Sequence, residues 1–271
     1  MKKYFIFFFV FFSCNYQQEK KVSLKKNDVL LYWDIFSPRK NYRPLVDVET
    51  SYNRSRYIKT IKLSGKKSYI PENLYLFDSL KRLMIELPNL KNFPKLEKMK
   101  SLSYLYIEIG SFPFPNNVIL FPKNYAHIDK SISCISYNER KKIQNIIFPD
   151  DMKIESLSMS ITLEQIPKTL KNLRYLKVLD IKISSTRIFL EFLPQSLEKL
   201  TITLDNIEEF DFNKLPKNIK RINLTSHKGI FKDYKKILEE GKKRKIFVSI
   251  NNENNGLEYP EETEHYYWIE W

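Results

Sequence analysis

Paired carboxylates are the feature of this chain that comes closest to a catalytic pattern. Two acidic residues stand side by side at Asp150-Asp151, Glu208-Glu209 and Glu261-Glu262. General acid–base catalysis needs a carboxylate that faces a base, a nucleophile or a second carboxylate across the reacting group. Adjacent residues on a strand or loop point apart instead, and none of the three pairs has a neighbouring base or nucleophile. We interpret the pairs as solvated charges and predict that the chain is not an enzyme.

Metal and phosphate sites are not indicated either. The sequence has three histidines and two cysteines, and their spacing matches no HExxH, CxxC or EF-hand pattern. Its five glycines lie too far apart to form GxGxxG, a P-loop or GxSxG, the motifs that bring a backbone close to a phosphate or hold a nucleophile. We therefore expect neither a metal nor an organic cofactor.

The opening residues, MKKYFIFFFVFFSC, are typical of an export signal. Lys2 and Lys3 form a positive start, and the apolar run from Tyr4 to Phe12 is too short to cross about 30 Å of hydrocarbon as a helix. The residues FFSC resemble a bacterial lipoprotein lipobox, although Phe11 stands where leucine is usual. This resemblance implies that Cys14 is lipidated and becomes the mature N-terminus. The alternative is an ordinary signal peptide with a chance cysteine.

One short pattern, apolar-x-x-apolar-x-apolar, recurs along the chain. It begins at residues 58, 80, 102, 132, 154, 176, 197 and 219, so most intervals are 22 residues long. The one long interval contains an insertion around residues 112–127. The copies include Leu80-Leu83-Ile85, Ile132-Ile135-Tyr137 and a weaker ninth copy at Lys243-Ile246-Val248. A fixed period of this length indicates a repeat protein whose coils share one core.

These copies resemble leucine-rich repeats over residues 55–250, and segments such as IPKTLKNL and LPQSLEKL resemble the bacterial LPxxLxxL variety. The resemblance implies an α/β repeat solenoid, a horseshoe of about eight or nine coils. Its parallel sheet would line the concave face, and short helical or 3₁₀ turns would form the convex face. The asparagine that usually bonds the turn is missing; Thr162, Ser184 and Asp205 stand at that position and could replace it in part.

The sequence therefore predicts five segments. They are a signal peptide at 1–13, a lipidated tether at 14–28, an N-terminal cap at 29–57, the solenoid at 58–250, and a C-terminal cap or tail at 251–271. The last segment ends in His265, Tyr266, Tyr267, Trp268 and Trp271. We interpret these aromatic residues as a packed cap or, alternatively, as a recognition tail.

The x positions of each copy, and the residue after it, are expected on the concave face because strand residues alternate in direction. Leucine-rich repeats most often bind proteins there, so the resemblance implies a protein partner. The predicted partner-binding residues are Lys81, Arg82, Tyr104, Tyr106, Glu108, Ser133, Ser136, Glu155, Ser158, Asp180 and Lys199. This face is basic at both ends and rich in hydroxyl groups at its centre. Cys134 is expected to face the same groove, covered by the insertion or bonded to another chain.

The positive charge of the chain suggests other classes of partner. The net charge is +14, and the isoelectric point is about 9.4. No nucleic-acid partner is expected, because lysine and arginine alternate with acids such as Glu86, Asp180 and Glu198. A structural or glycan-binding envelope protein that uses its basic ends is the alternative to protein binding. The lipid anchor implies a membrane-attached protein of the cell envelope, with the outer membrane or cell surface placed ahead of the inner membrane.

Overall fold

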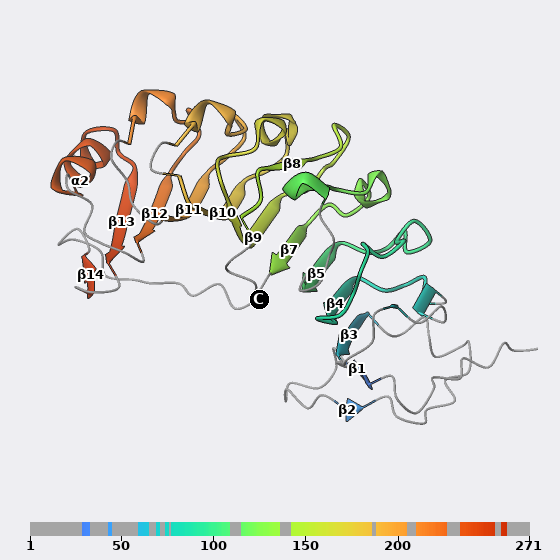
Figure 1. Cartoon of the computed structure of the whole chain (residues 1–271). Helices are drawn as coiled ribbons and strands as arrows, with labels where there is room; N and C mark the ends of the chain where they lie inside the picture. Colours follow the sequence, from blue (N-terminus) through green and yellow to red (C-terminus); the bar gives the residue numbers. More distant parts are fainter. Residues whose placement is uncertain are drawn as a thin grey trace, which may run out of the picture.

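The computed structural model shows a curved row of strands with short helical elements along its outer side (Figure 1). It describes residues 29–32, 43–44, 59–64, 69–70, 74–75, 77–108, 115–135, 142–185, 188–204, 210–226, 234–252 and 256–258. One 12-stranded sheet dominates it, in the order β14-β13-β12-β11-β10-β9-β7-β5-β4-β3-β1-β2. Its strands are β1 (Val29–Tyr32), β2 (Arg43–Pro44), β3 (Thr60–Ser64), β4 (Arg82–Glu86), β5 (Tyr104–Glu108), β7 (Ser131–Ile135), β9 (Ser156–Leu163), β10 (Val178–Ile183), β11 (Lys199–Leu204), β12 (Arg221–Ser226), β13 (Phe247–Asn252) and β14 (Gly256–Glu258).

From β3 to β13 every neighbouring pair in this sheet is parallel, with one strand from each coil. At the two ends the sheet continues with antiparallel strands, β1 on β3 and β14 on β13. These end strands occupy backbone groups that an open sheet edge would leave unpaired. They fall within the segments predicted as caps, most of whose other residues lie outside the described part.

Two rows of inward-pointing side chains form the core of the solenoid. Each strand contributes one residue to each row, because alternate strand residues point to the same side. The rows are Ile61, Leu83, Leu105, Ile132, Leu157, Leu179, Leu200, Ile222 and Val248, and Leu63, Ile85, Ile107, Cys134, Met159, Ile181, Ile202, Leu224 and Ile250, all at most 3% exposed. Burying one such aliphatic side chain contributes roughly 1.5–3 kcal/mol. A single coil cannot bury its own row, so stacking is what makes the fold stable. The architecture is the α/β leucine-rich-repeat solenoid that the repeat pattern predicted.

Short helical elements connect the strands on the outer side. They are the 3₁₀ helices η2 (Pro115–Asn117), η3 (Lys123–Tyr125), η4 (Lys168–Asn172), η5 (Leu190–Phe192) and η6 (Phe212–Lys214), and the α-helix α2 (Tyr234–Lys243). Pro167 directly precedes η4 in an extended conformation, where it gives up no ladder hydrogen bond. Within the described ranges, no helix combines the length and apolar character needed to cross a membrane.

Hydroxyl and amide side chains link successive coils on the outer side. The second residue after Pro167, Pro194 or Pro216 donates a hydrogen bond to a carbonyl of the preceding coil. These bonds run from Thr169 Oγ1 to the Ile146 carbonyl (2.7 Å), from Ser196 Oγ to the Leu176 carbonyl (2.8 Å) and from Asn218 Nδ2 to the Gln195 carbonyl (2.9 Å). They satisfy carbonyl groups of the preceding coil, of which that of Ile146 belongs to the short strand Asn145–Ile147.

The missing asparagine ladder is replaced at one predicted position. The Ser184 hydroxyl donates to the Leu163 carbonyl of the preceding coil at 3.3 Å, beside the backbone bond from Ser184 N–H to the same oxygen. Thr162 instead belongs to strand β9, where it pairs with Lys182. Asp205 lies outside the described residues.

The fourth copy of the repeat is shifted relative to our prediction. Strand β7 pairs Ile132 with Leu105 on one side and with Leu157 on the other. Ile132 and Cys134 therefore stand at the second and third positions of the repeat, like Leu105 and Ile107 in the preceding copy. The predicted copy Ile132-Ile135-Tyr137, which put Ile132 at the first position, was wrong, and Tyr137 lies outside the described residues. The backbone ladder fixes this register, and Ile135 turns outward, where it is half-buried.

The insertion around residues 112–127 fills the space behind β7 with aromatic side chains. Phe121 stacks at 5.0 Å from Phe148, and Tyr125 meets Phe93 edge-on at 5.9 Å. The Tyr125 hydroxyl donates to the Pro94 carbonyl at 3.1 Å, which satisfies a polar group that is otherwise fully buried. A separate parallel pair, β6 (Val118–Leu120) with β8 (Asn145–Ile147), contributes Ile119 and Ile146 to the same buried core.

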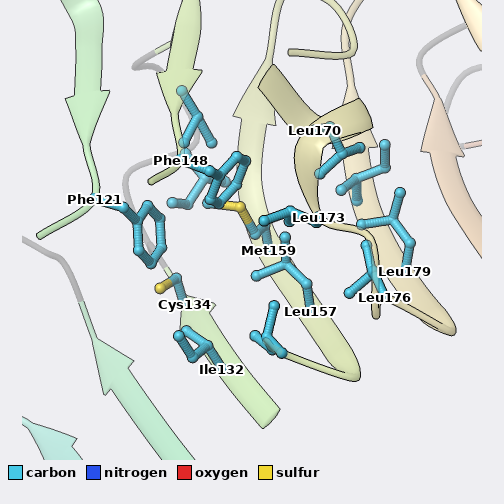
Figure 2. Packing of buried hydrophobic residues seen from close by; sticks show 14 of the residues in the cluster. Phe121, Ile132, Cys134, Phe148, Leu157, Met159, Leu170, Leu173, Leu176 and Leu179 are labelled. Carbon is cyan, nitrogen blue, oxygen red and sulfur yellow. The ribbon is translucent and has the colours of Figure 1, made fainter. Parts of the chain in front are cut away.

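Cys134 lies in this core and not on the concave face, which corrects our prediction. It is 0% exposed and belongs to the same buried cluster as Phe121 and Met159 (Figure 2). Burial raises the pKa of its thiol, so the nucleophilic thiolate does not form near neutral pH. The register shift explains the error, because the misplaced repeat had put Cys134 at an outward position. Burial also contradicts a disulfide from this residue to another chain across the groove.

Candidate binding surface

The concave face consists of the outward-pointing residues of strands β3 to β13, on the inner side of the curve (Figure 1). Residues paired across the parallel ladder form rows along it, about 4.8 Å apart. The first row is Thr60, Arg82, Tyr104, Ser131, Ser156, Val178, Lys199, Arg221 and Phe247. The second row is Lys62, Met84, Tyr106, Ser133, Ser158, Asp180, Thr201, Asn223 and Ser249.

The structure brings most of the predicted partner-binding residues onto this face. Those in the two rows are Arg82, Tyr104, Tyr106, Ser133, Ser158, Asp180 and Lys199. Lys81 and Glu155 lie immediately before β4 and β9, at the edge of the face, and Glu108 is the last residue of β5. Ser136 and the predicted lipidation site Cys14 lie outside the described residues.

The N-terminal end of the face combines an arginine with aromatic and charged groups. The Arg82 guanidinium lies over the Tyr104 ring, 4.5 Å from its centroid, and Lys62 Nζ pairs with Glu86 Oε1 at 2.6 Å. A stacked arginine of this kind contributes about 0.5–1 kcal/mol at an exposed site and fixes both side chains. Glu108 is only 7% exposed. Burial, and then the nearby Glu86 carboxylate, raise its pKa, while Lys62 acts in the opposite direction.

The centre of the face is lined by small hydroxyl side chains. Strands β7 and β9 present Ser131, Ser133, Ser156, Ser158 and Ser160. The Ser158 hydroxyl donates to Asp180 Oδ2 at 3.2 Å, which fixes the carboxylate in the middle of the row. Burial raises the pKa of Asp180, and the bond from Ser158 offsets part of that effect. The centre thus offers acceptors and donors without bulky side chains.

A second stacked pair and a polar chain mark the C-terminal end. The Arg221 guanidinium lies 4.9 Å from the centroid of the Phe247 ring. In the neighbouring row, Asn223 Nδ2 donates to Thr201 Oγ1 at 3.2 Å and Ser249 Oγ donates to Asn223 Oδ1 at 2.7 Å. Both ends of the face therefore present an arginine whose guanidinium lies over an aromatic ring.

Alternating charges border the face where the strands begin. Glu155 pairs with Lys130 at 2.8 Å and with Lys177 at 3.8 Å, and Glu198 pairs with Lys220 at 2.7 Å. The hydrogen bond from Lys130 holds the pKa of Glu155 below its usual range and raises the pKa of Lys130 itself. These pairs are substantially exposed and contribute little to stability, but they fix the charge pattern at the border.

The residues considered for catalysis do not assemble into a site in the described part of the chain. Asp150 accepts a hydrogen bond from Asn172 Nδ2 at 2.6 Å in an exposed turn, and Asp151 is exposed beside it. No group of three or more histidine, cysteine or acidic side chains close enough to hold a metal occurs within the described ranges. Glu208-Glu209 and Glu261-Glu262 lie outside those ranges.

Sequence reasoning missed the two arginine–aromatic pairs and the polar chain. The signal was nevertheless present, because residues one repeat apart become neighbours on the face. Tyr104 follows Arg82 by one repeat, and Asn223 follows Thr201 by one repeat. Aligning outward positions between copies, rather than within each copy, would have identified these contacts.

No family model and no curated protein matches this chain. Among solved structures, a leucine-rich-repeat protein of Leptospira interrogans is similar at 16% identity and a TM-score of 0.48, covering 73% of this chain and 50% of that one. InlP of Listeria monocytogenes is similar at 15% identity and a TM-score of 0.37, covering 75% of this chain and 64% of that one. This chain therefore spans less than two thirds of the length of either protein. The chain is similar to these bacterial leucine-rich-repeat proteins in fold alone.

Proposed function

We propose that this solenoid is a non-catalytic protein that binds another protein through its concave face. The observation that carries the proposal is the cluster of Arg82, Met84, Tyr104 and Tyr106 on β4 and β5. Arginine, methionine and tyrosine are enriched at protein interfaces, where they supply large contact area together with polar tips. The serines of β7 and β9 beside them leave room for the side chains of a partner.

The dimensions of the concave face suit such an interface. The strands from β3 to β13, spaced by about 4.8 Å, give a strip on the order of 40 Å long, and five residues of strand give about 17 Å of width. This area is comparable to the roughly 800 Å² that each partner contributes to a standard interface.

Site-specific photo-crosslinking in the native bacterium tests the proposal. A benzophenone amino acid replaces Tyr106 on the concave face or, as the control, Leu120 on the small outer sheet, which is 64% exposed. We expect a discrete adduct of one protein mass from position 106 and none from position 120. An adduct from position 120 alone, or none from position 106, contradicts binding by the concave face.

We also propose that the protein is exported and anchored in the cell envelope by lipid on Cys14. The sequence of the first fourteen residues supports this proposal, and the outer membrane or cell surface is the expected location. Metabolic labelling with a clickable fatty acid tests it. The wild-type protein should carry the label and Cys14→Ala should not, whereas an unlabelled wild-type protein contradicts the anchor.

Glycan binding is a second candidate, favoured by the C-terminal end of the concave face. Arg221 stacked on Phe247, with Lys199 beside it in the same row, provides a cation and an aromatic ring for an acidic sugar. Binding of an anionic glycan through these groups should weaken steeply with salt. A partner that stays bound at high salt, and is lost in Tyr104→Ala, favours the protein interface instead.

A further inference from the structure

One edge of the solenoid carries a concentration of positive charge near its C-terminal end. Strands β10 to β13 all run in the same direction, so the turns that precede them lie along one edge of the sheet. We call the exposed cations of these turns, and of the ends of η4 and α2 that lead into them, the basic edge: Lys171, Arg174, Lys177, Lys217, Lys220, Lys242, Lys243, Arg244 and Lys245. Within the described segments 171–177, 193–198, 215–220 and 242–246, Glu198 is the one acidic residue, and Glu155 and Glu240 contact these segments from outside them.

Fewer than half of these cations take part in an ion pair. Lys220 pairs with Glu198 at 2.7 Å and Lys177 with Glu155 at 3.8 Å, and Glu240 binds Lys243 at 3.8 Å and Arg244 at 2.8 Å. The other five have no acidic partner within 4.0 Å among the described residues: Lys171, Arg174, Lys217, Lys242 and Lys245. Like charges gathered on one edge repel each other, so the fold gains nothing from placing them together.

Lys245 gives independent evidence, because its backbone favours glycine. Its φ is 59°, in the left-handed region, at the end of α2. The Lys245 N–H bonds the Lys242 carbonyl at 3.1 Å, and the Ile246 N–H bonds the Gly241 carbonyl at 2.9 Å. This is the helix-ending pattern in which glycine is usual, since a side chain is strained in that conformation. A lysine is thus held at a position where glycine would stabilise the fold.

We propose that the basic edge binds the surface of an anionic phospholipid bilayer. A bilayer is flat and recognises charge without a groove, which suits turns that protrude from an edge. Each lysine or arginine near an anionic leaflet adds to the attraction. Tyr175, between Arg174 and Lys177, is 56% exposed and suits the headgroup region, where tyrosine is enriched. With the basic edge on the bilayer, the concave face points parallel to the membrane surface. It therefore stays open to a partner.

The inference rests on the proposed export and lipid anchor, which bring the chain to a membrane. Its geometry agrees with them. Val29 pairs with Ser64 at the opposite edge and the opposite end of the sheet from the basic edge, so a lipid-bearing segment must pass the width of the sheet, about 17 Å, to reach a bilayer at the basic edge. Residues 14–28 can span up to about 50 Å, which exceeds that width. Lipid near one end and the basic edge near the other would hold the solenoid along the membrane.

Vesicle sedimentation tests the basic edge separately from the anchor. The protein is the mature chain 14–271 with Cys14→Ser, so that no acyl chain contributes, and circular dichroism verifies its folding. The probes are vesicles of phosphatidylglycerol mixed with phosphatidylcholine, and vesicles of phosphatidylcholine alone. We expect binding to the anionic vesicles at low salt, a loss of that binding at high salt, and no binding to the neutral vesicles.

Matched variants locate the binding site. The triple variant Arg174→Gln, Lys217→Gln and Lys242→Gln should weaken vesicle binding by about 10- to 100-fold. The control triple variant removes the same charge from exposed lysines outside the edge, Lys91→Gln, Lys142→Gln and Lys236→Gln, and should change binding by about threefold or less. Equal losses in the two variants overturn the proposal.

Lys245→Gly separates binding from folding. It should raise the melting temperature by about 2–4 °C while weakening vesicle binding several-fold. Unchanged binding in this variant, or binding to soluble polygalacturonate but not to vesicles, overturns the assignment of a membrane surface. Failure of the vesicle experiments leaves the fatty-acid labelling of Cys14 unaffected, so the two proposals fail separately.

Discussion

Two adjacent apolar residues on β4 test which side of the sheet is the core. Leu83 points inward and is 1% exposed, whereas Met84 points outward and is half-buried between Lys62 and Tyr106. Their side chains are similar in size, so hydrophobicity alone predicts similar effects of truncation. Leu83→Ala removes buried methyl groups and leaves a cavity, which costs about 2–5 kcal/mol. Met84→Ala removes a side chain that remains partly in water, and should cost about 1 kcal/mol.

Thermal and urea unfolding of the two variants measures this difference. For a domain of this size, 1 kcal/mol corresponds to a change of about 2–4 °C in melting temperature. We therefore expect Leu83→Ala to melt about 4–20 °C below the wild type, and Met84→Ala to melt within about 4 °C of it. Equal destabilisation by the two substitutions, or a larger effect of Met84→Ala, would refute the assignment of faces and, with it, the concave surface.

Three further predictions follow from single residues. Cys134 should resist thiol reagents in the folded protein and react only on unfolding, because it is fully buried. Rapid labelling of the native protein would show that the register of β7 is wrong. Asp180→Asn should stabilise the protein near neutral pH, because the raised pKa of Asp180 reports an unfavourable buried charge. This gain in the free energy of unfolding should shrink as the pH falls from the raised pKa towards the ordinary pKa of aspartate, because the folded wild type then takes up the proton. A gain in stability that does not depend on pH would contradict this account. Gly241→Ala should cost about 1–3 kcal/mol in urea unfolding, because the added Cβ would overlap the Val248 side chain; a neutral effect would mean that α2 does not pack on β13 in this way.

The repeat period made the solenoid predictable from the sequence. A coil has one strand, and its two inward positions must be apolar because stacking is the only way to bury them. Copies with a regular interval were therefore assigned to the right face, as with Leu83 and Leu179. The same alternation correctly predicted that residues such as Arg82 and Asp180 point outward.

The fourth coil could not be predicted in the same way. Its sequence reads SISCISY, and in the strand Ser131–Ile135 the residues Ile132, Cys134 and Ile135 are all acceptable in the core, so the pattern alone admits two registers. The choice depends on the ladder to Leu105 and Leu157 and on the aromatic cluster supplied by the insertion. Those contacts are distant in sequence, and a local pattern does not encode them.

Side-chain contacts between coils were the other part that the pattern did not reveal. Whether Arg82 stacks on Tyr104, or Ser158 binds Asp180, depends on rotamers set by neighbours one repeat away. The identity of each residue and its row were accessible from the sequence, whereas its partner was not. The excess of cations on the basic edge emerges only when segments from three coils are brought to one edge of the sheet.

The central claim is that the concave face binds the partner. It is tested most directly by measuring the affinity of the crosslinked partner for a variant whose concave face is blocked. Ser133→Arg places a long side chain at the centre of the face, between Tyr106 and Ser158. Gln144→Arg makes the same change of charge at an exposed residue beside the small outer sheet. We predict that Ser133→Arg weakens binding by about tenfold or more at an unchanged melting temperature, and that Gln144→Arg has little effect. Unchanged affinity in Ser133→Arg, or an equal loss in Gln144→Arg, would contradict the concave face as the binding surface.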